Sequence, residues 1–449
     1  IDFLPPGTSF GSGIGTPFLR LQTWWKYMPE FVNYLSRCTY LLERGRPVSD
    51  VLWYLGDEIS HKPDQNYPFP EGFKYDYCNP DVLLNRLSVK NGKIVTPEGI
   101  EYSILWLNDN KRMLPETLEK LLALVREGAV VIGDAPEGLA TLSGQESAQK
   151  RFDAAVHALW GEVSKGCNRI GKGMVVSGMS LDEALCELKM SPDVTATGDA
   201  LWLHRQTKGA DWYFVTAPKG QGFKGDLSFR NSGYAEIWDP VTGEMEPAVN
   251  RKDGDRTVVS LDMPRAGSCF VVFRHDRKGE SKPVLLEEAG TMPVGNEWTL
   301  AFPDGWGAPA SLKADELKAW KDLDISPEGK AFSGTVTYTT SFDIENAKEY
   351  AGYSLDLGAV EMIASVSLNG KPLRVLWTPP YRLDITDAIQ TGENILAVEV
   401  TGTWFNRLVY DAGQPEENRK TWTISGPSKD APLRDSGLLG PVVLKVFND

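Results

Sequence analysis

The chain has 449 residues, of which 41% are hydrophobic and 24% charged, an ordinary globular composition that excludes a disordered or fibrous class. A formal net charge of −14 without any block of basic residues disfavours nucleic acid as a partner, and no stretch approaches the ~18 consecutive apolar residues of a membrane span. Five scattered cysteines without CxxC spacing predict neither a zinc site nor a disulfide framework.

The length predicts about three domains if each takes roughly 150 residues. Residues 1–28 are rich in Gly, Pro, Ser and Thr, and we expect them to form a loop that packs on another surface. The chain starts at Ile1 without a methionine or a signal-like apolar segment, which indicates a processed product or a fragment.

Apolar residues recur at three- and four-residue steps from Pro29, which predicts a helix with one buried stripe. Gly45 is expected to end this helix. The predicted stripe consists of Phe31, Tyr34, Leu35, Cys38, Leu41 and Leu42.

The run Val51–Leu55 is apolar on both faces, which predicts a buried parallel strand. Its carboxyl end leads into the sequence GDE, and α/β sheets bind ligands at such ends. Adjacent residues of an extended chain point to opposite sides, so we single out Glu58 as a catalytic carboxylate and Asp57 as a substrate contact. The alternative is that Glu58 caps the next turn or pairs with Lys62 or Arg46.

Two consecutive tryptophans, Trp24 and Trp25, lie close to Arg20 and Gln22. Flat apolar rings with polar neighbours are typical of a sugar subsite, so we predict Arg20, Trp24 and Trp25 as substrate-binding residues. Packing of the tryptophans in a core is the alternative.

Helix and strand patterns alternate from residue 29 to about 190, which predicts a flavodoxin- or amidotransferase-like parallel sheet over residues 47–192. The helices are expected over 115–127, 152–160 and 181–188, and the strands over 104–107, 129–133 and 173–177. Asn91 and Gly92 predict a hairpin turn. The glycine-rich runs GIGTPF and GKGMVVSG do not lie between a strand and a helix as a nucleotide site requires.

Short alternating strands predict two β-rich domains in the rest of the chain. Residues 193–277 are expected to form a small antiparallel β-sandwich, and residues 278–299 a linker. Residues 300–449 resemble the jelly-roll, galactose-binding-like sandwiches attached to many glycosidases. We expect Trp404, Asn406 and Arg407 to brace this sandwich rather than to touch a glycan.

Several separated segments, in their order along the chain, are similar to the α-L-rhamnosidases of glycoside hydrolase family 106. These segments are LRLQTWW, YLSRC, VSDVLWYLGDE, FPEGFKYDYCNPDVLLNRLSV, GAVVIGDAPEG, WDPVTGE, WFNRLV and SGLLGPV. The resemblance implies inverting hydrolysis of terminal α-L-rhamnosyl linkages by two carboxylates, a rhamnose-containing glycan as partner, and dependence on calcium but on no organic cofactor. It also implies a bacterial protein that is periplasmic or secreted.

In that family a catalytic (β/α)8 barrel precedes these segments and carries the catalytic glutamates. A barrel takes roughly 200 to 250 residues, so residues 1–46 hold only the end of one or an N-terminal extension. We therefore expect this chain to be a C-terminal portion that frames the substrate, with the upstream half of its own polypeptide as a partner. A non-catalytic carbohydrate-binding or scaffolding protein that has lost the barrel, or a glycosidase of different specificity, are the alternatives.

Overall fold

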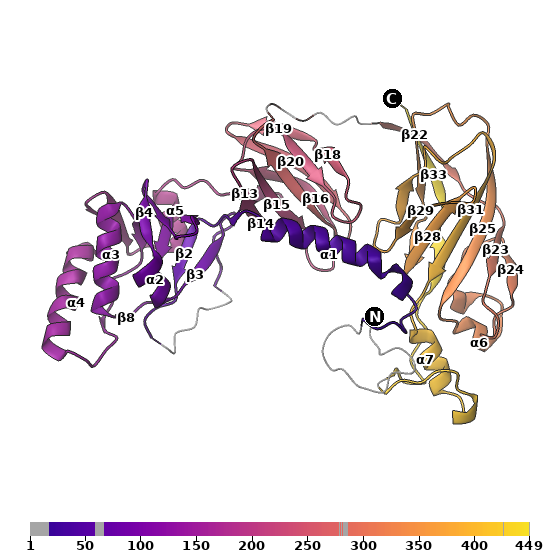
Figure 1. Cartoon of the computed structure of the whole chain (residues 1–449), viewed down its shortest axis with the longest axis horizontal. Coiled ribbons are helices and arrows are strands. Elements are labelled where there is room, and N and C mark those ends of the chain that lie inside the picture. Colours follow the sequence, from indigo (N-terminus) through magenta and orange to yellow (C-terminus); the bar gives the residue numbers. More distant parts are fainter. Residues whose placement is uncertain are drawn as a thin grey trace. The chain divides into compact units, whose positions relative to one another are not determined.

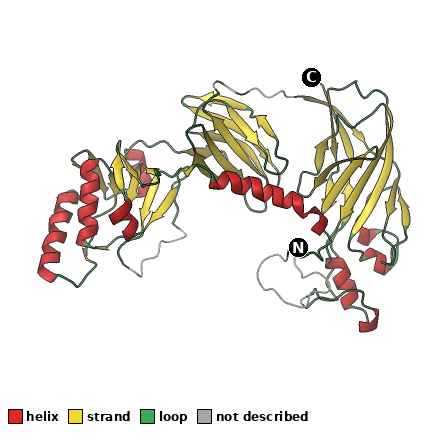
Figure 2. Cartoon of the chain, viewed as in Figure 1, coloured by secondary structure: helices red, strands yellow, loops and turns green. Residues whose placement is uncertain are grey.

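The structure is a computed structural model that describes residues 18–58, 67–277, 279, 281, 286–424 and 426–448. It confirms a multidomain protein that combines an α/β domain with all-β domains (Figures 1 and 2). The chain divides into two compact units, residues 38–283 and residues 1–37 together with 284–449.

The first unit contains a six-stranded sheet in the order β11-β12-β9-β7-β2-β3. Its strands are β2 (Val51–Tyr54), β3 (Tyr75–Cys78), β7 (Ile104–Trp106), β9 (Val130–Ile132), β11 (Gly166–Ile170) and β12 (Gly173–Ser177). All neighbouring pairs are parallel except β11 and β12. If the parallel strands are numbered along the chain, their order across the sheet is therefore 2-1-3-4-5. The direction of the connections reverses beside β2.

Helices cover both faces of this sheet. Alternate residues of β2 point to opposite layers: Leu52 and Tyr54 pack in the core that contains α2, α3 and α4, whereas Val51 and Trp53 pack in the core that contains α5. The helices are α2 (Pro80–Arg86), α3 (Pro115–Glu127), α4 (Gln145–Trp160) and α5 (Leu181–Glu187). Figure 1 shows α3 and α4 side by side. The predicted strand and helix types of this region are confirmed.

Two small sheets complete the α/β domain. One is antiparallel and consists of β4 (Ser88–Lys90), β5 (Lys93–Val95) and β6 (Glu101–Tyr102), and the other pairs β8 (Arg112–Met113) with β10 (Gly138–Leu139). The hairpin predicted at Asn91 and Gly92 joins β4 to β5, with both residues at positive φ.

The predicted first helix forms as α1 (Met28–Glu43), after the 3-10 turn η1 (Trp25–Tyr27). The prediction of one buried stripe is wrong for most of its members, because only Cys38 is buried in this helix and Leu35 is 44% exposed. Phe31 and Tyr34 are half-buried against Trp377, whose ring centroid lies 5.5 and 5.6 Å from theirs. The single side chain of Trp377 covers less of the α1 surface than packing in a groove between other elements would.

The small β-sandwich consists of a six-stranded and a four-stranded sheet. The first sheet contains β1 (Arg46–Pro47), β14 (Leu201–Gln206), β15 (Ala210–Thr216), β21 (Ser268–Arg274), β17 (Ala235–Trp238) and β18 (Met245–Pro247). The second contains β13 (Val194–Ala196), β16 (Phe223–Phe229), β20 (Arg256–Met263) and β19 (Asn250–Asp253). In the described residues 18–46 the structure places η1, α1 and the start of β1, which pairs with β14. That residues 1–46 are the end of a barrel or an N-terminal extension stays a prediction.

A buried polar network joins the small sandwich to the α/β domain through Asp193. Its carboxylate accepts a hydrogen bond from the Tyr213 hydroxyl at 2.9 Å and lies 2.7 Å from Nδ1 of His204. Nε2 of His204 lies 2.8 Å from the carboxylate of Asp211, so an acceptor faces each ring nitrogen. Arg230 lies between Asp193 and Asp50, 3.7 and 3.0 Å from their carboxylate oxygens. Asp50 precedes β2, so the network connects both domains.

The network favours the protonated form of His204. Burial alone would lower the pKa of this imidazole, but its hydrogen bonds and charge interactions with Asp193 and Asp211 outweigh burial and raise the pKa above its usual value near 6.5. The pKa of Asp211 is lowered, because its bonds to His204 and His275 outweigh the effect of burial.

The second unit contains a larger β-sandwich. One sheet has the order β22 (Glu287–Pro293), β33 (Val443–Asn448), β26 (Gly352–Asp356) and β30 (Arg382–Asp384), and the other β24 (Ser311–Ala314), β23 (Trp298–Ala301), β25 (Thr335–Ile344), β31 (Gly392–Thr401), β28 (Ile363–Leu368) and β29 (Lys371–Leu376). A separate pair consists of β27 (Ala359–Glu361) and β32 (Gly437–Gly440). The expected linker over 278–299 is wrong for residues 287–293, which form β22 and pair with β33.

Short helices complete this unit and include η2 (Trp320–Asp322), α6 (Pro327–Lys330), α7 (Phe405–Ala412) and η3 (Glu416–Asn418). Arg407 on α7 is fully buried and donates to Asp411 at 2.6 and 3.0 Å and to Glu328 at 2.8 Å. Asn406 donates to the Arg434 carbonyl. The predicted bracing role of Asn406 and Arg407 is confirmed. None of the described helices combines the length and apolarity of a membrane span.

We expect His204→Gln to destabilise the small sandwich by roughly 3–5 kcal/mol, because two buried carboxylates lose their charged partner. In the native chain, the contribution of His204 is complete below about pH 6.5 and is lost as the pH rises through its raised folded-state pKa. Hydrogen exchange of the peptides that contain β14 and β15, corrected for intrinsic rates between pH 6 and 9, measures both effects. His157→Gln, on the exposed side of α4, is the matched control. Equal protection in the two variants would contradict this role.

Candidate functional site

The candidate site lies at the carboxyl ends of the parallel strands, beside the point where the connections reverse direction. Leu55 follows β2 and donates its N–H to the Cys78 carbonyl at 2.8 Å, so the pairing with β3 continues past the strand. Gly56 then adopts φ +91°, a conformation that glycine reaches without strain. The turn places Asp57 and Glu58 at this edge of the sheet, where α/β folds bind ligands.

Asp57 connects β2 to the start of α3. Its carboxylate accepts hydrogen bonds from the Tyr54 hydroxyl at 2.7 Å, the Thr117 hydroxyl at 2.8 Å and the Leu114 N–H at 2.9 Å. Leu114 occupies the N-cap of α3 and has no side chain that could cap it, so Asp57 serves as the cap from another part of the chain. Burial and the Asp57 charge raise the pKa of Tyr54, which keeps this phenol a donor.

Glu58 differs from Asp57 because its side chain is exposed. The two neighbours thus face different surroundings, as expected for consecutive residues of an extended segment. Lys62, one of its alternative partners, lies outside the described residues, and the other, Arg46, donates to the Gly99 carbonyl at 2.9 Å. A catalytic role for Glu58 stays a prediction.

Further carboxylates follow the neighbouring strands, and sequence reasoning missed them. Asp109 comes after β7 and Asp134 after β9, and both side chains are exposed. Asp134 accepts the Gly178 N–H at 2.7 Å, which ties the end of β9 to the end of β12. The signal in the sequence was present, since Asp57, Asp109 and Asp134 each follow a buried apolar run within three positions. Carboxyl groups are among the side chains that serve in acid–base catalysis.

Asn110 connects the ends of β2 and β7, beside the point where the connections of the sheet reverse direction. It is 8% exposed, and its amide Nδ2 donates to the Asn108 carbonyl at 3.1 Å and to the Tyr54 carbonyl at 3.4 Å. Its Oδ1 is buried without a hydrogen-bond partner in the described structure. Asn110 therefore fixes the ends of these two strands relative to each other.

An aromatic row crosses three strands on the face that α5 covers. Trp106 on β7, Trp53 on β2 and Tyr77 on β3 lie in register. The ring centroids of Trp53 and Trp106 are 4.4 Å apart, and those of Trp53 and Tyr77 are 5.5 Å apart. The two tryptophans are buried, whereas Tyr77 is 46% exposed at the edge of the sheet. Tyr77 thus offers a ring and a hydroxyl to a ligand such as a sugar.

The predicted substrate contacts Arg20, Trp24 and Trp25 belong to the other unit. Trp24 is 4% exposed and packs with Tyr27 and Ile363, so its ring is used in a core. Trp25 is 37% exposed and Arg20 is exposed. These three residues and the pair Asp57 and Glu58 therefore belong to different units, and sugar contacts by any of the five stay predictions.

A calcium site was tested against the side chains that could hold the ion. Calcium takes six to eight oxygen ligands, mostly from carboxylates and carbonyls. Across the described ranges of the chain, no three His, Cys, Asp or Glu side chains gather closely enough to hold a metal ion. The residues that the structure describes therefore do not fit a calcium cage built on carboxylates.

Comparisons with known proteins show what this chain is similar to. A family model described as alpha-L-rhamnosidase, of glycoside hydrolase family 106, matches residues 1–252. The solved rhamnosidase from Novosphingobium sp. PP1Y is 33% identical, with a TM-score of 0.87 over 96% of this chain and 42% of its own. A putative beta-glucuronidase from Formosa agariphila is 23% identical over 96% of this chain and 58% of its own length. The chain thus spans about half the length of these relatives.

We expect Asp57→Ala to destabilise the α/β domain by roughly 2–4 kcal/mol, because it leaves the buried Tyr54 and Thr117 hydroxyls and the Leu114 N–H without their acceptor. Glu58→Ala should change the free energy of unfolding by about 0.5 kcal/mol or less, since this side chain is exposed. Urea unfolding with hydrogen exchange of the α3 peptides compares the two variants. If Asp57→Ala were as stable as the native chain, the carboxylate would not be the cap of α3.

Proposed function

Because the chain belongs to glycoside hydrolase family 106, we propose that it is the substrate-framing part of an α-L-rhamnosidase, whose reaction is the hydrolysis of terminal α-L-rhamnosyl linkages in a polysaccharide. Substrate-framing means that its side chains contact the glycan and that it supplies at most one of the two carboxylates that break the bond. The likeness to a solved rhamnosidase over nearly the whole of this chain carries the proposal. A rhamnose-containing glycan is the proposed partner, together with the remaining part of such an enzyme.

We assign the domains within this proposal by their topology. The parallel sheet is flavodoxin-like, which the strand order 2-1-3-4-5 supports. The sandwich of residues 286–448 is a galactose-binding-like jelly roll, supported by its facing sheets of four and six antiparallel strands. Such domains place loops at one end of a rigid scaffold, where binding residues occur most often.

The proposed chemistry is inverting hydrolysis, in which one carboxylic acid protonates the leaving oxygen and a carboxylate activates water. Glu58 takes one of these roles or holds a sugar hydroxyl, because it is the exposed carboxylate after the central strand β2. Asp57 positions this turn through its bonds to α3. Tyr77 stacks on a sugar ring. Trp25 and Arg20 are proposed as contacts on the other unit.

Two features of the proposal derive from the family alone. They are dependence on calcium and a periplasmic or secreted location in a bacterium. The side chains of the described residues give no support to a calcium cage, so no step of the proposed chemistry involves the metal.

A second candidate function is carbohydrate binding without catalysis. The aromatic row that ends at the exposed Tyr77 favours it, because stacking surfaces serve binding as well as hydrolysis. A protein of this kind would retain affinity for rhamnose-bearing glycans and would not need Glu58.

We expect no hydrolysis of 4-nitrophenyl α-L-rhamnoside, with or without Ca²⁺, by the chain alone. A chimera in which this chain replaces the matched region of the Novosphingobium rhamnosidase should be active. In the chimera, Glu58→Gln should lower kcat by about 100-fold or more, as loss of an acid–base group does. Glu127→Gln should leave kcat unchanged, because this exposed glutamate ends α3 next to the start of β9, away from the strand ends.

Each outcome decides one part of the proposal. Turnover by the isolated chain at the rate of the chimera would contradict the framing role, and a folded but inactive chimera would contradict the rhamnosidase assignment. Full kcat in the Glu58→Gln chimera would remove Glu58 from the chemistry. An array of rhamnose-bearing glycans then tests the binding function, and silence across it would exclude that alternative.

A further inference from the structure

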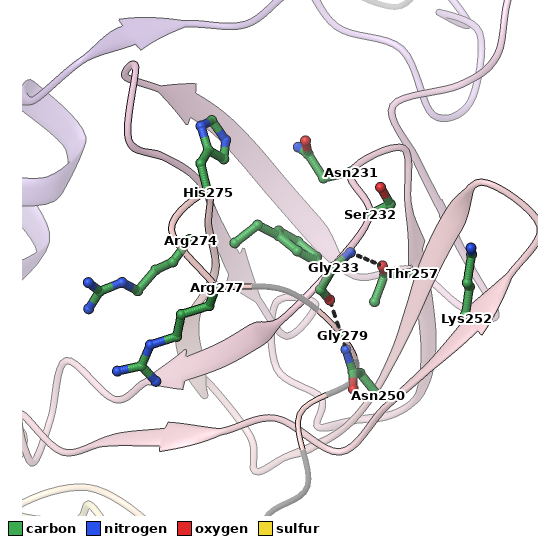
Figure 3. A pocket seen from close by; sticks show the side chains of 11 residues that line it. Asn231, Ser232, Gly233, Asn250, Lys252, Thr257, Arg274, His275, Arg277 and Gly279 are labelled. Carbon is green, nitrogen blue, oxygen red and sulfur yellow. Dashed lines mark hydrogen bonds between the residues drawn. The ribbon is translucent and has the colours of Figure 1, made fainter.

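A second candidate binding site lies in the small β-sandwich, on a different domain from the strand ends described above. It is a pocket with a volume of about 460 Å³, within the range of about 300–1,000 Å³ that is typical of small-molecule sites. The lining comes from the turn of residues 231–233, from β19 and the start of β20, and from the end of β21 with the residues after it. Figure 3 shows these side chains.

The lining is cationic. Lys252, Arg274 and Arg277 carry permanent positive charges, and none of the described lining residues is Asp or Glu. Figure 3 shows the two arginines on the side opposite Lys252. The carboxylates that pair with Arg274 and Arg277 come from outside the lining, so an anion in the pocket would meet the N–H donors of these cations rather than carboxylates.

The arginines keep donors available for a ligand. Arg274 uses Nε and one terminal nitrogen on Asp276, at 3.1 and 2.8 Å. Arg277 places one terminal nitrogen 2.8 Å from Glu236. A guanidinium carries five N–H donors, so these carboxylates, which lie outside the lining, fix the two side chains without exhausting them.

Neutral polar groups complete the lining. Asn231 provides an amide and the exposed Ser232 a hydroxyl, whereas the Asn250 amide already bonds to Ser281 and to the Gly233 carbonyl. Such groups accept and donate hydrogen bonds at the same time, as sugar hydroxyls do. The pocket therefore combines cations for an acidic group with partners for several hydroxyls.

A continuous chain of hydrogen bonds, buried in its middle, holds two lining residues in place. It starts at His275, whose Nε2 lies 2.6 Å from Asp211, and passes through His204 and Asp193 to Tyr213. It ends at Asn231, which donates to the Tyr213 hydroxyl at 2.8 Å. Both ends of the chain line the pocket, so the polar interior of the sandwich sets the position of this part of the lining.

The same chain of hydrogen bonds favours the protonated form of His275. The Lys208 carbonyl, at 3.0 Å from Nδ1, and Asp211 both accept from the His275 ring and raise its pKa above the usual value. Because both ring nitrogens are occupied, the His275 ring offers no further hydrogen bond to a ligand in the pocket.

We propose that this pocket binds the carboxylate-bearing sugar unit of an acidic glycan, a hexuronate, with its cationic lining on the carboxylate and Asn231 and Ser232 on the ring hydroxyls. The sugar part of this assignment rests on membership in a glycoside hydrolase family, and the acidic part rests on the lining alone. The site is separate from the proposed hydrolysis and does not depend on it.

Isothermal titration of the whole chain with methyl β-D-glucuronide, and with the matched neutral methyl β-D-glucoside, tests the proposal. We expect the glucuronide to bind about tenfold or more tightly, because hydrogen bonds to charged partners are the stronger ones. Sodium acetate, which offers the carboxylate without the sugar, should bind more weakly than the glucuronide. Equal binding of the two glycosides, or of acetate and the glucuronide, would overturn the proposal, as would no binding at millimolar concentration.

Matched substitutions locate the site. Lys252→Gln and Arg274→Gln should each weaken glucuronide binding about tenfold. Both are compatible with folding, since Lys252 is exposed and the Asp276 partner of Arg274 has a 63% exposed side chain. Lys224→Gln removes the same charge from an exposed pair with Asp262 on the same sandwich and should leave binding unchanged. An equal loss in Lys224→Gln, or no loss in either pocket variant, would overturn the assignment.

Discussion

The carboxylate of Asp193 is the contact on which the arrangement of the first unit depends. Through Arg230 it faces Asp50, the residue before β2, and through His204 and Tyr213 it faces the interior of the small sandwich. Its backbone contributes as well, because its N–H donates to the Gly72 carbonyl and its carbonyl accepts the Arg230 N–H. At Gly72, with φ +79°, a Cβ would come within 2.5 Å of the Val194 carbonyl, so the close approach of the two domains requires glycine there. The strand that leads to Asp57 and Glu58 is thereby held at its other end by the sandwich.

The charged groups around Asp193 explain why the α/β domain and the small sandwich dock in one specific arrangement. Burying a carboxylate costs free energy that an apolar side chain would not, and the cost is offset only when each oxygen has a partner. At Asp193 both oxygens are used, and Asp211 likewise faces two imidazoles. A shifted docking of the domains would leave these charges buried and unpaired. The same pairing makes the small sandwich sensitive to the protonation of its two histidines.

Local patterns in the sequence predicted the helices, strands and turns that are determined by residues close to them in the sequence. The apolar run at β2, the Pro115 and Gly128 boundaries of α3 and the turn at Asn91 and Gly92 depend on nearest neighbours, and the structure contains all of them. The predictions that were wrong depended on distant residues. Residues 287–293 have the composition of a linker, yet they pair with a strand about 150 residues later. The partial burial of α1 depends on Trp377, which is distant in the sequence. The spacing of Asp193, His204, Asp211 and His275 contains no motif that would predict their hydrogen-bond network. Asp57 was predicted from its place after a strand, but its bonds to α3 follow from tertiary structure.

The two candidate sites of the first unit differ in charge, and this difference follows from their supporting elements. Parallel strands that end in polar turns present exposed carboxylates at one edge of the sheet, a surface suited to proton transfer and to neutral sugars. The sandwich loops present the guanidinium groups of Arg274 and Arg277, whose acidic partners lie outside the lining, a surface suited to holding an acid without reacting with it. A carboxylate-bearing sugar would be repelled by the first surface and attracted by the second. Asp193 connects the two domains that carry these surfaces. A glycan with neutral and acidic units would therefore meet one surface that favours its neutral units and one that favours its acidic units.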